Sequence, residues 1–159
     1  MSQVPKGRPR TGARVAAVQA LFQSEASGES PETVLNQFLR HRIGPQAGES
    51  FDDGRVAEAD SGLFVSIMRK VGTNSVDLDA IISTHLATGW PLAKLDPVLR
   101  ALLRASAAEL RDGKEPPARV IIREYLDIAH GFFTGEEPRF AAGVLDALAR
   151  TLRPSEFGG

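Results

Sequence analysis

With 159 residues the chain is long enough for one compact domain or for two small helical halves packed together. Its 42% apolar and 25% charged residues are ordinary for a soluble globular protein. It contains no cysteine, which excludes a disulfide framework, a thiolate nucleophile and a cysteine-based zinc site, and which fits a reducing cytoplasm. No apolar run reaches the roughly 18 residues of a membrane span, so we expect no membrane contact.

The N-terminal segment is basic, although the net charge of the whole chain is only −1. Between Met1 and Ser24 the sequence has four basic residues and no acidic one, which leaves a net charge of −5 on the remaining residues. Residues 1–12 contain prolines and glycines and too little apolar surface to join a core, so we predict a flexible basic arm. Such an arm is typical of proteins that bind polyanions, and a solubilising tail is the alternative.

About seven helices are predicted along the chain, the first over residues 13–24, where apolar side chains recur at helical spacing. Three further helices are indicated by a capping residue followed by proline. A polar residue followed by proline favours a helix start, and it occurs at Ser30 and Pro31, at Asp96 and Pro97, and at Glu137 and Pro138, with Thr134 as an alternative last cap. The remaining helices are predicted over residues 54–71, from a cap at Asn74, and after Pro116 and Pro117.

An apolar run at residues 120–122 resembles a strand, but no second strand-like run exists to pair with it. We therefore predict an all-α fold with residues 13–154 as one domain of two packed helical bundles, 13–88 and 95–154. Residues 155–159 are predicted to form a tail. Residues 44–54 have no apolar periodicity and are predicted to form a surface connection.

Catalytic signatures are absent from the sequence. There is no G-x-S-x-G motif and no phosphate-binding glycine loop, and His41, His85 and His130 lie on three different predicted helices. Neighbouring carboxylates such as Asp77 and Asp79 are predicted to be solvated on an outer helix face. The sequence therefore predicts a protein that is not an enzyme and needs no cofactor.

Three blocks of sequence carry a family resemblance. They are ARVAAVQALFQ at residues 13–23, ALLRASAAEL at 101–110 and VIIREYLDIAHGFFTGEEPRFAAGVLDALARTLRP at 120–154. Their order and spacing resemble the NusB family of transcription antitermination proteins. The chain departs from the family pattern at Ala108, where an aromatic residue is common, and at Arg123 and Ala142, which replace asparagines.

The resemblance implies an all-α protein that binds the single-stranded boxA element of nascent RNA together with NusE, a small-subunit ribosomal protein. The pair is expected to help RNA polymerase read through terminators, chiefly in ribosomal RNA operons, without a cofactor. Family members include monomers and dimers, so a homodimer remains open. The alternative is a helical protein-interaction or dimerisation module without RNA binding.

The resemblance also suggests which residues meet RNA. Arg10 and Arg14 match arm positions of the family, and Lys6 and Arg8 lie where the family is variable but basic. If all four cations met phosphates of a single strand, the log–log salt slope of binding would be roughly −3. With so few phosphate contacts, we expect the protein to bind RNA weakly by itself and to need a protein partner for tighter binding.

The start of the last predicted helix supplies the other candidates. Phe140, beside Arg139, matches a family phenylalanine and is a candidate for base stacking, with core packing as the alternative. Glu136 occupies an acidic family position that is expected to repel phosphate, and first-turn charge for the helix dipole is the alternative. Phe22 matches an aromatic position near the partner-binding face, again with core burial as the alternative.

A basic stripe formed by Arg100, Arg104 and Arg111 on one predicted helix is assigned to structure rather than to RNA. For Arg104 we predict an internal ion pair, with Glu109 or Glu124 as the partner.

Overall fold

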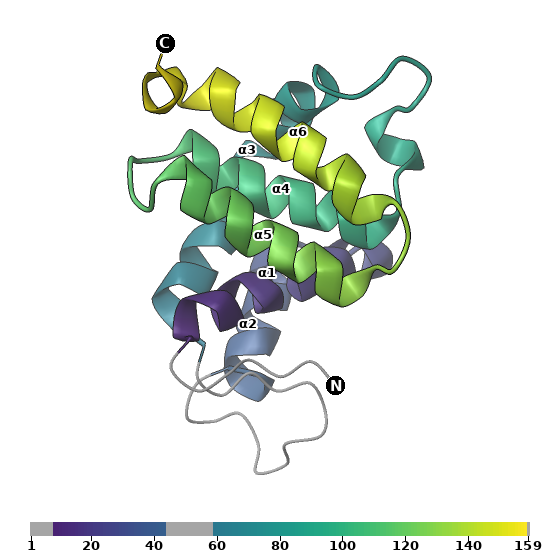
Figure 1. Cartoon of the computed structure of the whole chain (residues 1–159). Helices are drawn as coiled ribbons and strands as arrows, with labels where there is room; N and C mark the ends of the chain where they lie inside the picture. The colour runs from purple at the N-terminus through teal and green to yellow at the C-terminus, as the bar shows by residue number, and fades with distance from the viewer. Residues whose placement is uncertain (1–7, 44–58, 159) are drawn as a thin grey trace. The chain divides into compact units, whose positions relative to one another are not determined.

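The computed structural model describes residues 8–43 and 59–158 (Figure 1). Its elements are α1 (Pro9–Ser27), α2 (Pro31–His41), α3 (Ser61–Ser83), η1 (Leu92–Lys94), α4 (Pro97–Arg111), α5 (Ala118–Phe132), α6 (Glu137–Leu152) and η2 (Pro154–Phe157). The predicted all-α class is confirmed for this described part of the chain, which contains no strand. Within the same residues no helix is long and apolar enough to cross a membrane.

The chain divides into two compact units, Met1–Thr73 and Asn74–Gly159, and the boundary falls inside α3. At Asn74 the backbone leaves the helical region, with φ −124° and ψ 24°, so α3 consists of two helical segments joined at a bend. This bend accounts for six helices in the described residues where seven were predicted, because the cap expected at Asn74 lies inside α3. The boundary also lies earlier in the chain than the predicted division between residues 88 and 95.

In the first unit, α1 and α2 are joined by a link of residues 28–30 that turns them antiparallel. Gly28 adopts a positive φ of 79°, the left-handed conformation in which α1 ends. Ser30 caps α2, because its hydroxyl accepts a hydrogen bond from the Thr33 backbone nitrogen at 3.1 Å. Small side chains let the buried face of α1 approach its neighbours closely, and these are Ala13, Ala16, Ala17 and Ala20.

Two contacts fix where α3 begins in the first unit. The backbone nitrogen of Asp60 donates to the Pro9 carbonyl at 2.8 Å. Phe64, in the first turn of α3, stacks on Phe38 near the end of α2, with ring centroids 5.8 Å apart. The start of α1, the end of α2 and the start of α3 therefore lie at the same end of this unit.

In the second unit α4 is the central helix, with α5 and α6 packed on it (Figure 1). Every residue from Leu99 to Leu110 except Arg104 is buried, as expected of a helix covered on all sides. The Asp96 carboxylate caps its start by accepting hydrogen bonds from Val98 at 2.8 Å and Leu99 at 3.2 Å. The run at residues 120–122 is helical and opens α5, as the sequence predicted.

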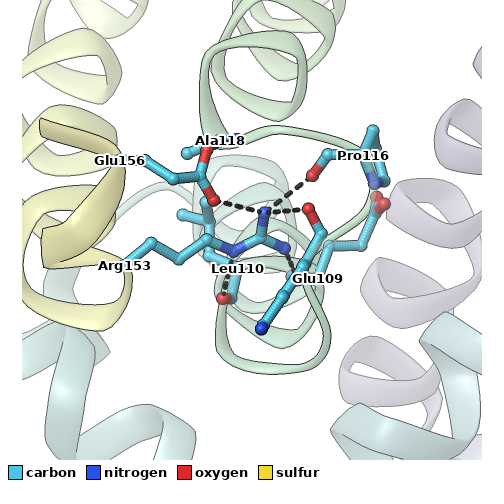
Figure 2. Close-up of polar contacts among 7 residues, drawn as sticks. Glu109, Leu110, Pro116, Ala118, Arg153 and Glu156 are labelled. Carbon is cyan, nitrogen blue, oxygen red and sulfur yellow. Dashed lines mark hydrogen bonds and ion pairs between the residues drawn. The ribbon is translucent and has the colours of Figure 1, made fainter.

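Arg153, directly after α6, is buried and organises the far end of α4 (Figure 2). Its guanidinium donates to the backbone carbonyls of Glu109, Leu110, Lys114 and Pro116 at 2.7–3.2 Å. The last carbonyls of a helix have no donor within the helix, so this side chain satisfies acceptors that would otherwise be buried without a partner.

Glu156 in η2 completes this cluster. Its carboxylate accepts hydrogen bonds from the backbone nitrogen of Ala118, at the start of α5, at 2.8 Å and from Arg153 at 3.1 Å. The Ala118 hydrogen bond, and then Arg153, hold the pKa of Glu156 below its ordinary value of 4.5. The C-terminal residues therefore join α4, α5 and α6, although they were predicted to be a simple tail.

The basic stripe on α4 is structural, as predicted. Arg100 is buried and donates to three backbone carbonyls around η1. Arg104 donates to the Asp79 carboxylate at 2.8 and 2.9 Å, and Arg111 lies 3.7 Å from Asp77. Asp77 is exposed, as predicted, whereas Asp79 is partly buried and links the second segment of α3 to α4.

The single tyrosine and the single tryptophan of the chain both lie in the second unit, in opposite environments. Tyr125 is fully buried, and its hydroxyl donates to the buried Glu109 carboxylate at 2.6 Å. Trp90, in the connection between α3 and η1, is 57% exposed.

Candidate nucleic-acid interface

The start of α1 gathers positive charge on the surface of the first unit. The helix begins at Pro9, four residues before the predicted start, so part of the predicted flexible arm is helical. Arg8 and Arg10 flank this proline, both are exposed, and the first turn contains no acidic residue. Because a helix N-terminus carries partial positive charge, the two guanidiniums add to a field that already attracts anions. Lys6 lies outside the described residues.

Arg14 is the candidate that the structure contradicts. Only 2% of its surface is exposed, because it falls on the α1 face that enters the core of the first unit. A guanidinium enclosed by protein cannot reach an RNA phosphate, and a buried charge needs partners inside the protein. We therefore correct the prediction and assign Arg14 to the structure of the first unit.

The start of α6 brings together the three candidates predicted for the second unit. Glu136 and Arg139 are exposed, and Phe140 is partly buried. The backbone nitrogen of Phe140 donates to the Glu136 carbonyl at 3.0 Å. The two residues therefore lie one helical turn apart. The Glu136 side chain makes no capping hydrogen bond. The exposed carboxylate is therefore not engaged in capping α6.

Phe22 lies near the end of α1, away from the arginines at its start. At a rise of about 1.5 Å per residue, Phe22 is about 18 Å from Arg10 along the helix axis. The Phe22 ring is 38% exposed rather than enclosed in the core. It is thus accessible for a contact, but one that is separate from the basic start of α1.

The sequence interpretation missed an aromatic residue at the corner between α5 and α6. Phe132 is 40% exposed, and its ring centroid lies 6.5 Å from that of Phe133. Adjacent helical residues point about 100° apart, so two neighbouring phenylalanines rarely both enter a core. That spacing was a usable signal. Phe132 adds accessible aromatic surface at the corner that leads into Phe140.

Comparison with known proteins gives the family. Residues 11–150 match the model of the NusB family. The chain is 58% identical over 153 residues to the transcription antitermination protein NusB of Granulibacter bethesdensis, which covers 96% of this chain and 94% of the relative.

Solved structures agree on the fold. The NusB of T. maritima superposes with a TM-score of 0.74 at 27% identity, covering 99% of this chain and 100% of that chain. A solved complex of antitermination factors NusB and NusE with dsRNA has the same fold, with a TM-score of 0.67 at 23% identity, covering 91% of this chain and 98% of that one. The chain therefore belongs to the NusB family.

Proposed function

We propose that this protein is a transcription antitermination factor that binds unpaired boxA RNA together with NusE and promotes read-through by RNA polymerase. The family and the high identity to a relative of that name support the biological role. The observation that carries the RNA-binding part is the start of α1, where Arg8 and Arg10 are exposed at the positive end of a helix. The positive electrostatic potential of these two arginines and the helix end suits the binding of phosphates.

The proposed contacts divide by chemistry. Arg8 and Arg10, with Lys6, neutralise phosphates, while the accessible parts of Phe140 and Phe132 stack on unpaired bases. Arg139 adds a cation beside Phe140. Phosphate neutralisation by so few residues is weak on its own, which makes a protein partner necessary.

Two further residues are proposed to affect RNA affinity and partner binding. Glu136 repels phosphate at the start of α6 and so limits affinity. Phe22, about 18 Å along α1 from the basic start, contacts the protein partner instead of RNA. We propose a binding role without catalysis or a cofactor, carried out in the cytoplasm where transcripts are made.

The test is a titration of a fluorescently labelled boxA-type RNA, followed by anisotropy, with and without NusE and at several salt concentrations. The variant combines Arg8→Gln with Arg10→Gln. The matched control combines Lys114→Gln with Arg123→Gln, two exposed cations of the second unit. Losing two phosphate contacts should reduce the log–log salt slope by about 1.4 and weaken binding, whereas the control should match the wild type.

Equal binding by the wild type and the Arg8 and Arg10 variant would overturn the RNA-binding part. The competing function is a helical protein-interaction module without RNA binding, which the exposed ring of Phe22 favours. It predicts that NusE binds whether or not RNA is present and that boxA RNA adds nothing. A duplex of the same sequence belongs in the titration, because the solved complex of the family contains dsRNA.

A further inference from the structure

The end of α2 carries a second group of basic residues in the first unit. Arg40 and His41 are exposed and Arg42 is partly buried, and all three lie in or directly after the last turn of the helix. The Arg42 guanidinium carbon lies 4.9 Å from the centroid of the Phe38 ring, close enough for a cation–π contact. Arg42 is thus held over a buried ring while part of it still reaches solvent.

These basic residues share one end of the unit with the start of α1. The Asp60 backbone nitrogen contacts the Pro9 carbonyl at 2.8 Å, and Phe64 stacks on Phe38 at 5.8 Å. Asp60 and Phe64 are only four residues apart, about 6 Å along the helix, so the first turn of α3 bridges the two basic groups. We define the cationic end as Arg8, Arg10, Arg40 and Arg42.

Among the residues that the structure describes, acidic side chains are scarce at the cationic end. Of the acidic side chains that the structure describes in the first unit, Glu25, Glu29 and Glu32 lie at the opposite end, around the α1–α2 link. There Glu32 forms an ion pair with Arg69 at 2.9 Å. Asp60 is the exception, and one of its carboxylate oxygens accepts a hydrogen bond from the Leu63 nitrogen at 2.9 Å as a helix cap.

Helix dipoles alone do not account for this separation of charge. Basic residues at a helix C-terminus are favourable, which explains Arg40 and His41 locally. At the start of α1 the same effect opposes Arg8 and Arg10, because the helix end is itself positive there. A polyanion bound across both helix ends would stabilise both groups at once.

We propose that Arg40 and Arg42 bind phosphates of the same unpaired RNA strand that Arg8 and Arg10 contact, so that the strand crosses from the start of α1 to the end of α2. This inference rests on the proposed RNA-binding function. It adds two phosphate contacts to that function and extends the RNA site along the first unit.

The experiment is the salt-dependent titration of boxA-type RNA with the full-length protein and NusE, using Arg40→Gln combined with Arg42→Gln. We expect the log–log salt slope to fall by about 1.4 relative to the wild type, since each single-strand contact contributes about 0.7. The combination of Arg40→Lys and Arg42→Lys keeps both charges and should keep the wild-type slope. The exposed pair Lys114→Gln and Arg123→Gln controls for a general change in net charge.

The possible failures are distinguishable. If the wild type does not bind the RNA, the proposed function itself fails. If the wild type binds and the Arg40 and Arg42 variant retains its full slope, the inference is overturned while the proposed function stands. An equal fall in slope for the control pair also overturns it, because the effect would then be one of overall charge. Circular dichroism verifies that the glutamine variant is folded, and the lysine variant provides the comparison if it is not.

Discussion

Glu156 is a surface carboxylate whose protonation matters to the fold, because its two hydrogen-bond donors belong to other segments. One donor is the first backbone nitrogen of α5, and the other is Arg153, which also holds the end of α4. These donors favour the ionised carboxylate and keep the pKa of Glu156 lowered in the folded protein.

We predict that Glu156→Gln removes a pH-dependent part of the stability. A carboxyl group with a lowered folded pKa stabilises the fold above its unfolded pKa, and this contribution is lost as the pH falls through the folded value. The wild type should therefore unfold at a higher temperature than the variant at about pH 7, and the difference should shrink below the ordinary value of 4.5. Thermal unfolding followed by circular dichroism at several pH values measures this.

Glu115→Gln, at an exposed carboxylate on the α4–α5 loop, is the matched control. Its difference in unfolding temperature from the wild type should not shrink as the pH is lowered. A difference between wild type and Glu156→Gln that stays constant as the solution is acidified would contradict the assigned role of this carboxylate.

Single residues were the hardest features to predict from the sequence. The sequence predicts that Arg14 belongs to the RNA-binding basic residues. In the structure α1 begins at Pro9 and the Arg14 side chain is buried. The Arg104–Asp79 pair joins residues 25 positions apart, so it depends on how α3 and α4 pack. Local sequence patterns contain no information about such distant contacts.

The starts of α2 and α4 were predictable because a side chain caps each of them. Ser30 and Asp96 accept the expected backbone hydrogen bonds, and the prolines that follow them occupy the first turn. The start of α1 was missed because Arg8 provides no side-chain cap. Its first turn is instead held by a tertiary contact, the hydrogen bond from Asp60 to Pro9.

We predict that Asp96→Ala destabilises the second unit by about 0.5–2 kcal/mol, the usual cost of losing an N-cap. Its carboxylate satisfies the nitrogens of Val98 and Leu99, and alanine cannot replace it. Chemical denaturation followed by circular dichroism gives the change in the free energy of unfolding. Asp127→Ala, at an exposed position of α5, is the comparison and should change stability much less. Equal effects of the two substitutions would argue against a capping role.

At the scale of the whole molecule, the sequence shows a basic arm but not the cationic end. The run of Arg40, His41 and Arg42 stands some thirty positions away from Arg10. Only the antiparallel course of α1 and α2, and the start of α3 between them, brings the two groups to one end of the first unit. The two compact units divide at the bend at Asn74, inside α3, whereas the sequence analysis divided the two bundles between residues 88 and 95.

The two RNA models predict different salt dependences for the protein alone. With Lys6, Arg8 and Arg10 as the only phosphate contacts, the log–log slope should be about −2. With Arg40 and Arg42 included it should be about −3.5. Measuring the binding constant of an unpaired boxA-type RNA over a range of salt concentrations separates these values, and a slope near zero would contradict both.

The positions of Trp90 and Tyr125 determine which part of the protein ultraviolet spectroscopy reports on during unfolding. Both chromophores lie in the second unit. Tryptophan emission and tyrosine absorbance therefore report the unfolding of the second unit and do not report the unfolding of the first. Trp90 is already hydrated in the native state, which leaves its emission maximum little room to shift on denaturation. A Phe22→Trp reporter, at a partly exposed ring of α1, would give the first unit a signal of its own and show whether the two units melt together.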